Sequence, residues 1–405
     1  MERYNEYNDS GVYFIPDIPN SWQVLKAKYL FKQEKREVCP EDEIVTCFRD
    51  GQVTLRKNRR TEGFTNSMKE IGYQGVRKGD LVIHNMDAFA GAIGVSDSDG
   101  KGTPVYACCT PKRNDINQYY YCYLLRYLAR NGFILSLAKG IRERSTDFRF
   151  NDFKELYLPV PSKEEQDAIV SYIDLQSTKI DEAIAQQQKM IDLLNERKQI
   201  IINNAVTKGL NPDAPMKDSG VDWIGEIPEH WEVRKLKHIA KLKSGDTISS
   251  DSFTEDGFPV YGGNGFRGYT NRFTNDGEYV LIGRQGALCG NVNYATGKFF
   301  ASEHAVVVYP YDHENVAWLG EVIRASNLNQ YSQSAAQPGL AVSVIENIAY
   351  PYPPEKERTA IAEYLAQQMN AINAALHNIE RQISLLQERK QIIINDVVTG
   401  KVKVL

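Results

Sequence analysis

The segment Glu196-Arg-Lys-Gln-Ile-Ile-Ile-Asn203 returns unchanged as Glu388-Arg-Lys-Gln-Ile-Ile-Ile-Asn395, and each copy stands near the end of a long stretch without Gly or Pro. A second pair of segments is related in the same way. Asp9-Ser-Gly-Val12 recurs as Asp218-Ser-Gly-Val221, in both cases ahead of an Ile-Pro pair and a Trp. Because both motifs recur in the same order, the sequence predicts an internal duplication.

The two motifs are repeated at different distances. Asp218 follows Asp9 by 209 positions (218 − 9), whereas Glu388 follows Glu196 by 192 positions (388 − 196). The part between the motifs is therefore 17 residues longer in the first copy (209 − 192). The motifs are conserved between the two copies, whereas the segments between them have diverged. This is typical of one scaffold that carries two different binding surfaces.

The stretch from 164 to 206 and its counterpart after Pro354 predict two long helices, because aliphatic residues recur in them every seven positions. Prolines precede each helix, its first turn is acidic, and Gly209 or Gly400 follows it. We expect the two stripes to pair antiparallel. The predicted core positions are Ile173, Ile180, Leu194, Ile201, Leu365, Ile372, Ile379, Leu386 and Ile393.

A helix of roughly 43 residues at ~1.5 Å per residue is about 65 Å long, close to two turns of B-form DNA. It could serve as a ruler, although a single heptad stripe more often only drives dimerisation. The identical faces of the two helices could serve two copies of the same partner. Their predicted partner-binding residues are Arg197, Lys198, Gln199, Arg389, Lys390 and Gln391.

The variable segments are predicted to be strand-rich. In the second copy, 279–282 and 305–309 have the composition of buried strands, while 262–272 and 283–286 have that of loops rich in Gly, Asn and Arg. Arg, Asn and Gln side chains hydrogen-bond base edges, and glycines let a backbone approach phosphate. Ordinary turns with solvated side chains are the alternative. The candidate nucleic-acid contacts here are Asn264, Arg267, Asn271, Arg272, Arg284 and Gln285.

The first copy has basic clusters at 56–60 and 139–144 instead. A run of this kind is usually a solvated face, but in a chain of net charge −4 and pI about 6.0 it would also be the local patch that a nucleic-acid groove needs. The overall charge argues against a protein that coats nucleic acid by charge alone. The candidate contacts here are Lys57, Asn58, Arg59, Arg60, Lys139, Arg142 and Arg144.

Composition and motifs limit the class of protein further. The chain has 405 residues, 42% of them hydrophobic, which is enough for two cores, and no apolar run approaches the roughly 20 residues of a membrane span. Together with the absence of a signal peptide at Met1, this predicts a cytoplasmic protein that does not associate with a membrane. The six cysteines show no ligand spacing with His, so we expect reduced, mostly buried thiols and no metal site.

Catalytic signatures are missing from the sequence. There is no phosphate-binding loop, no dinucleotide fingerprint, no His-Glu-x-x-His and no Asn/Asp-Pro-Pro-aromatic segment, so we predict a non-catalytic chain with no cofactor of its own. The scattered histidines, including His304 beside Glu303, are interpreted as structural residues.

These motifs together resemble the specificity subunits of type I restriction-modification systems. The resemblance rests on the segment 219–231, on Leu281-Ile-Gly-Arg-Gln-Gly-Ala-Leu-Cys-Gly290 followed by Ala301-Ser-Glu-His-Ala305, on Gly79-Asp-Leu-Val82, and on the twin helices. It covers essentially the whole chain, and its motifs recur in order in both halves.

The resemblance implies an α+β protein with an internal pseudo-two-fold repeat: two mixed α/β target-recognition domains of similar fold, joined by two long antiparallel coiled-coil helices. The implied parts are target-recognition domains at 1–160 and 211–352 and spacer helices at 161–210 and 353–405. Each domain would read one half of a split, asymmetric site on double-stranded DNA in a bacterial or archaeal cell.

The same resemblance implies partners. The helices would bind two copies of the methyltransferase subunit, which carries S-adenosylmethionine and methylates adenine. Restriction subunits, which use ATP and Mg²⁺, would join for cleavage. The first half departs from the pattern, because it has Tyr13-Phe-Ile-Pro16 where the second has Asp222-Trp-Ile-Gly225, and it lacks a clear Gly-Arg-Gln-Gly loop.

Two rival functions stay open on sequence alone. A non-enzymatic scaffold could use the coiled coil to organise proteins and the variable domains to bind proteins or sugars. A single-chain nuclease or methyltransferase is the other rival, against which the missing cofactor and metal motifs argue.

Overall fold

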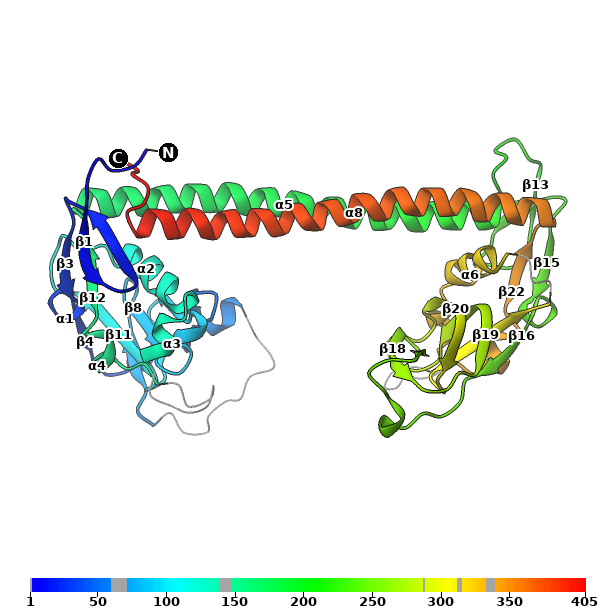
Figure 1. The fold of residues 1–405 in the computed structure, drawn as a ribbon, viewed down its shortest axis with the longest axis horizontal. Coiled ribbons are helices and arrows are strands. Elements are labelled where there is room, and N and C mark those ends of the chain that lie inside the picture. Colours follow the sequence, from blue (N-terminus) through cyan, green and yellow to red (C-terminus); the bar gives the residue numbers. More distant parts are fainter. Residues whose placement is uncertain (1, 60–70, 138–146, 287, 312–314, 333–338) are drawn as a thin grey trace. The chain divides into compact units, whose positions relative to one another are not determined.

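The computed structural model describes the whole chain except residues 1, 60–70, 138–146, 287, 312–314 and 333–338. It divides into two compact units. Unit 1 consists of Met1–Gln186 and Gln382–Leu405, and unit 2 of Gln187–Arg381. Each unit therefore contains one part of each long helix, α5 (Lys163–Lys208) and α8 (Glu355–Val398) (Figure 1).

Unit 1 is built around a four-stranded antiparallel sheet in the order β4-β11-β8-β9. Helix α2 (Gln118–Arg130) packs against this sheet. The described elements of unit 1, besides α2 and its halves of the long helices, are β1 (Tyr7–Val12), β2 (Ile15–Pro19), β3 (Gln23–Lys26), α1 (Ala27–Leu30), β4 (Phe31–Glu34), β5 (Val45–Cys47), β6 (Val53–Leu55), η1 (Arg56–Asn58), β7 (Gln74–Val76), β8 (Leu81–His84), η2 (Ala88–Ala90), β9 (Ile93–Val95), β10 (Gly100–Gly102), β11 (Tyr106–Pro111), α3 (Phe133–Leu137), α4 (Phe150–Phe153) and β12 (Tyr157–Val160).

Unit 2 repeats the sheet and extends it, in the order β16-β21-β19-β20-β17-β18. Helix α6 (Val316–Ala325) packs on β19 and β20. The other described elements of unit 2 are β13 (Met216–Asp218), β14 (Glu226–Pro228), β15 (Glu232–Lys235), η4 (Leu236–His238), β16 (Ala240–Ser244), η5 (Ser250–Ser252), β17 (Phe258–Gly262), β18 (Gly265–Thr270), β19 (Asn275–Gly283), β20 (Val292–Ala301), β21 (Ala305–Pro310), η6 (Leu328–Tyr331), α7 (Val342–Ile345) and β22 (Ala349–Tyr352).

The repeat extends to the strand register. In unit 1, Ile83 pairs with Ala107 on one side and Ile93 on the other, and in unit 2 Ile282 pairs with Val306 and Val292. Every one of these positions is related to its counterpart by the same shift of 199 residue numbers (282 − 83). The predicted fold, with two related α/β domains on paired long helices, is confirmed.

The long helices form where the sequence predicts them and pack antiparallel within each unit. In unit 1, Lys390 of α8 pairs with Asp181 of α5 at 2.7 Å, and in unit 2 the Lys198 ammonium donates to Asn373 Oδ1 at 3.3 Å. Of the predicted core positions, Ile173, Ile180, Leu365, Ile372 and Ile393 are buried, and Leu194, Ile201, Ile379 and Leu386 are half-buried.

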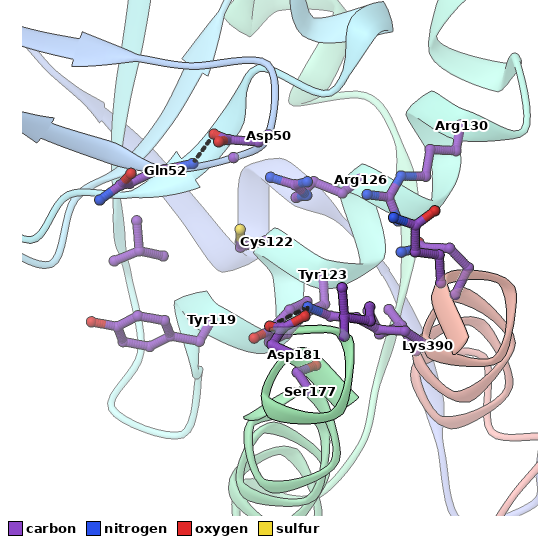
Figure 2. Close-up of a pocket in the computed structure, with 16 residues that line it drawn as sticks. Asp50, Gln52, Tyr119, Cys122, Tyr123, Arg126, Arg130, Ser177, Asp181 and Lys390 are labelled. Carbon is purple, nitrogen blue, oxygen red and sulfur yellow. Dashed lines mark hydrogen bonds and ion pairs between the residues drawn. The ribbon is translucent and has the colours of Figure 1, made fainter. Parts of the chain in front are cut away.

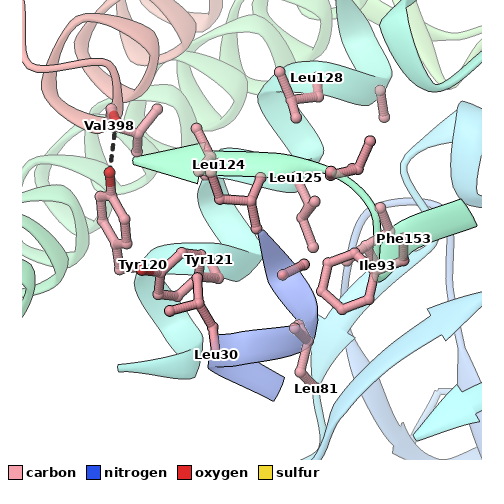
Figure 3. Packing of buried hydrophobic residues seen from close by; sticks show 14 of the residues in the cluster. Leu30, Leu81, Ile93, Tyr120, Tyr121, Leu124, Leu125, Leu128, Phe153 and Val398 are labelled. Atoms are coloured by element: carbon pink, nitrogen blue, oxygen red, sulfur yellow. Dashed lines mark hydrogen bonds between the residues drawn. The ribbon is translucent and has the colours of Figure 1, made fainter. Parts of the chain in front are cut away.

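The main core of unit 1 lies between the sheet, α2 and the long helices (Figure 3). Tyr120 and Tyr121 begin the buried face of α2, and Leu124, Leu125 and Leu128 continue it. The Tyr120 hydroxyl donates to the Val398 carbonyl at 3.0 Å, so it satisfies a carbonyl at the end of α8 that has no partner within the helix.

One local prediction is wrong. The segment 262–272 is not a single loop, because Gly265–Thr270 is β18 and forms a hairpin with β17. Gly262 pairs with Gly265, which leaves Gly263 and Asn264 as a two-residue turn. The positive φ of this hairpin lies at Gly265, the first residue after the turn, which has φ 94°, a conformation that Gly adopts without steric cost.

The remaining predictions concern absences. The six cysteines are free, and burial raises the pKa of Cys108 to about 12 and that of Cys122 to about 11. Among the residues that the structure describes, no group of His, Cys, Asp and Glu could hold a metal ion. Within the same residues, no helix combines the length and the apolar character that crossing a membrane requires.

Candidate nucleic-acid interface

The loops of the second copy meet in a pocket of about 470 Å³, here called the loop pocket. The β17–β18 turn forms one side, and the segment after β19 forms the other. The two backbones are in direct contact, since a Cβ on Gly283 would lie 2.2 Å from the Gly263 carbonyl oxygen. The lining residues are Gly263, Asn264, Gly265, Phe266, Arg267, Gln285, Gly286, Leu288 and His304.

Three of the six predicted contacts of the second copy are thus brought together: Asn264, Arg267 and Gln285. Hydrogen bonds hold two of them. Asn291 Nδ2 donates to Asn264 Oδ1 at 3.0 Å, and Gln285 Oε1 lies 2.9 Å from His304 Nδ1. His304 was interpreted as a purely structural residue, but it lines the loop pocket and orients Gln285. Its place directly before β21 could have suggested this.

The arginines of this region carry uncompensated charge. Arg267 stacks on Phe253 at 5.7 Å and Arg272 on Phe300 at 5.0 Å, while Arg284 Nη1 donates to Ser244 Oγ at 3.3 Å. None of the three contacts a carboxylate within the described part of the chain. Arg272, Asn271 and Arg284 do not line the loop pocket.

The basic cluster of the first copy differs from the arginines of the second copy, because its charged side chains have carboxylate partners. Lys57 pairs with Glu43 at 2.6 Å and Arg59 with Asp50 at 2.6 Å, so both charges are offset. Asn58 Nδ2 donates to Thr54 Oγ1 at 2.8 Å. These residues lie on or directly after η1. The predicted contacts Arg60, Lys139, Arg142 and Arg144 lie outside the described residues.

The predicted partner-binding residues divide by exposure. Arg197, Gln199 and Arg389 are exposed, whereas Lys198 and Lys390 are half-buried in the contacts between α5 and α8. In unit 1, Lys390 lines a pocket of about 720 Å³ between α2 and the two long helices (Figure 2). Gln391 also lines this pocket, and its buried Oε1 has no partner among the residues described.

The repeated motif also exposes apolar side chains, which are not among the predicted partner-binding residues. Leu193 and Ile200 are 50% and 52% exposed, and their counterparts Leu385 and Ile392 are 55% and 50% exposed. Residues seven apart lie on the same face of a helix. These two pairs are here called the twin apolar faces. Their equal spacing in both copies was the signal that could have identified them.

Comparison with known proteins agrees with this architecture. The family profile described as "Type I restriction modification DNA specificity domain" matches residues 228–385. The EcoprrI specificity subunit of Escherichia coli is 38% identical over 153 residues, which span 36% of this chain and 38% of that protein. The putative type I restriction enzyme MjaX specificity subunit of Methanocaldococcus jannaschii is 25% identical over 96% of both chains.

Solved structures share the fold. A chain from a study of complex assembly and conformational transition of a type I R-M system has a TM-score of 0.74 at 15% identity, over 95% of this chain and 99% of that one. The HsdS subunit of Thermoanaerobacter tengcongensis has a TM-score of 0.54 at 16% identity, over 95% and 98%.

The repeated sheets and the long helices that both units share define a class of two-domain proteins built on one helical scaffold. Within that class, the chain is similar over nearly its whole length to specificity subunits of type I restriction-modification systems, and residues 228–385 match the DNA specificity domain of that family. The relatives named here are specificity subunits, so the similarity indicates a recognition component and not a catalytic one.

Proposed function

We propose that the chain reads a bipartite, asymmetric site on double-stranded DNA and holds two methyltransferase subunits on it. Residues 1–160 and 211–352 would be the two target-recognition domains. The observation that carries the proposal is the loop pocket, where Asn264, Arg267 and Gln285 converge beside arginines without carboxylate partners.

The chemistry of the loop pocket suits a base edge. Arg donates in a fork to guanine, and Asn or Gln both donates and accepts toward adenine. Arg272 and Arg284, which lie outside the pocket, suit phosphates, because phosphate contacts fix the register of a protein on DNA. Since the two domains carry different loops, we expect their half-sites to differ in sequence, unlike the half-sites of a symmetric homodimer.

The twin apolar faces support the docking of two identical partners. Each face joins two half-exposed aliphatic side chains to the exposed arginine of the same repeated motif, Arg197 or Arg389. The buried core of a protein interface is more apolar than the rest of the surface, and Arg is enriched in interfaces. Two equal faces in one chain therefore predict two copies of one methyltransferase subunit.

The remaining roles would lie on the partners. S-adenosylmethionine would bind to the methyltransferase subunits, and ATP and Mg²⁺ to restriction subunits, since this chain has no sequence motif for any of them. The lengths of α5 and α8 would set the number of unread base pairs between the half-sites.

Long-read mapping of N6-methyladenine tests the proposal. DNA from cells that co-express this chain with a methyltransferase subunit is compared with DNA from cells that lack the chain. We expect one split, non-palindromic motif that disappears with the chain. An identical methylation pattern in both samples would refute the proposal.

A further inference from the structure

The shift of 199 residues that relates the two sheets also relates the segments that follow β8 and β19. The His84 amide donates to the Ala92 carbonyl, as the Gly283 amide donates to the Asn291 carbonyl. The next backbone hydrogen bond is also equivalent in the two units. Asn85 N donates to Val105 O at 2.9 Å, and Arg284 N donates to His304 O at 2.9 Å. Asn85 therefore occupies the position of Arg284 in the backbone framework.

The neighbouring residues follow the same correspondence. Met86 takes the position of Gln285 (285 − 86 = 199), and Val105 takes that of His304 (304 − 105 = 199). On the adjacent strand, Glu34 pairs with Cys108 as Lys243 pairs with Val307, so the residue after Glu34, Lys35, corresponds to Ser244. The segment Asn85–Asp87 is thus the counterpart of the Arg-Gln-Gly segment, although the two share no residue.

These counterparts line a pocket of about 590 Å³ in unit 1, here called the Asn85 pocket. It contains Lys35, Asn85, Met86 and Val105, and α4 contributes Phe150. Two of these positions, Met86 and Val105, correspond to Gln285 and His304 of the loop pocket, and Asn85 corresponds to Arg284 directly before Gln285, so the same place in the fold is hollowed in both domains.

Two polar groups of the Asn85 pocket have no partner among the described residues. Asn85 Oδ1 is buried and has no hydrogen-bond partner in the described structure. Lys35 is exposed and pairs with no carboxylate among the same residues. Arg149 also lines the pocket, but it pairs with Asp147 at 2.5 Å. A buried amide acceptor without a partner is costly, so a ligand that satisfies it gains binding energy.

We infer that the Asn85 pocket is the base-reading site of the first domain and that Asn85 is its specificity-determining residue. The inference rests on the proposed function. The ligand is the edge of a nucleobase, and adenine is the base that an Asn amide recognises with both its donor and its acceptor. Lys35 provides a cation for the adjacent phosphate, and Met86 and Phe150 provide apolar walls.

The experiment uses the full chain with its methyltransferase subunit and maps N6-methyladenine. Asn85→Ala is compared with Gln285→Ala, which changes the other domain. We expect Asn85→Ala to relax one position of one half-site by roughly ten- to a hundred-fold, and Gln285→Ala to relax a position only in the other half-site. That pattern would also assign each half-site to its domain.

A second variant distinguishes a lost base contact from misfolding of the domain. Asn85→Asp keeps the shape of the side chain but only accepts hydrogen bonds when ionised, so we expect the preferred base at that position to change from adenine to cytosine. If both Asn85 variants keep the wild-type motif while Gln285→Ala alters it, the inference is wrong and the proposed function stands. If no motif depends on the wild-type chain, both fall together.

Discussion

The ring of Trp22 lies against Gly400, two residues beyond the end of α8. A Cβ on Gly400 would stand 3.0 Å from Cη2 of Trp22 and 2.6 Å from Cδ of Pro19. In unit 2, a Cβ on Gly209 would stand 3.0 Å from Cζ2 of Trp231. The Ile-Pro and Trp of each repeated N-terminal motif thus bind the end of a long helix.

This contact predicts that Gly400→Ala destabilises unit 1 strongly. Gly400 has φ 75°, and so does Gly132, around which a Cβ would meet nothing within 4 Å. Gly132→Ala therefore reports the cost of the backbone conformation alone, about 1 to 2 kcal/mol. We expect Gly400→Ala to lower the free energy of unfolding, measured with denaturant, by more than Gly132→Ala does. Equal losses would show that the contact with Trp22 and Pro19 adds nothing.

Tyr120→Phe removes the hydrogen bond to the Val398 carbonyl and leaves that buried carbonyl without its partner. We expect a loss of about 1 to 3 kcal/mol in the free energy of unfolding. Tyr119→Phe is the matched control, because Tyr119 is 45% exposed and neighbours Tyr120 on α2. A loss as small as that of the control would mean that water replaces the bond.

The same tyrosine predicts a dependence on pH. Burial raises the pKa of Tyr120 well above its ordinary value of 10.0. A raised folded-state pKa contributes stability below the unfolded pKa, and this contribution is lost as the pH rises above about 10. Tyr120→Phe should therefore flatten the decline of stability between pH 9.5 and pH 11. An unchanged slope would contradict the assignment.

The twin apolar faces predict the stoichiometry of the complex. Leu193→Ser with Ile200→Ser should reduce binding from two methyltransferase subunits to one, and the same change at Leu385 and Ile392 as well should abolish it. Native mass spectrometry counts the copies. Leu175→Ser is the control, since Leu175 is 52% exposed on α5 but outside the repeated motif. Two bound copies in the fourfold variant would exclude these faces.

The loop pocket predicts two kinds of defect on DNA. Gln285→Ala should relax selectivity at one base position, because Gln285 lines the loop pocket. Arg272→Ala should instead weaken binding equally on all sequences and reduce the slope of affinity against salt by about one ion. Competition binding at several salt concentrations separates the two. If Gln285→Ala instead lowered the affinity equally for all sequences, Gln285 would contact the DNA backbone and not a base.

The ruler role is tested by adding one heptad to each helix, after Gln186 in α5 and after Arg381 in α8. Seven residues preserve the apolar series and add ~10 Å, so the unread spacer should grow by about 3 base pairs. Methylation mapping measures the spacer directly. A spacer that keeps its length would show that the helices do not set it.

Much of the fold could be predicted from the sequence, because the periodicity of a helix and the Gly or Pro residues at its ends are signals carried by residues close together in the chain. The long helices and the strands around Val280 and Val307 follow from such signals. The β17–β18 hairpin could not be predicted as reliably, because the glycines on both sides of its turn also suit an irregular loop.

The site was harder to predict for a different reason. Asn85 and Arg284 are equivalent through strand register and backbone hydrogen bonds, not through residue type, so comparison of the two halves by sequence does not pair them. In the same way, sequence does not reveal that Lys57 and Arg59 are neutralised by Glu43 and Asp50, because each pair is joined only by folding.

The division of the chain has a consequence for its biosynthesis. Unit 2 is continuous in sequence, whereas unit 1 needs the segment Gln382–Leu405, which supplies Ile393, Ile394 and Val397 to its core. During translation this segment leaves the ribosome after the rest of unit 1 and all of unit 2. The domain made first therefore waits with an incomplete core while the domain made second can already fold, which reverses the usual N-to-C order of domain maturation.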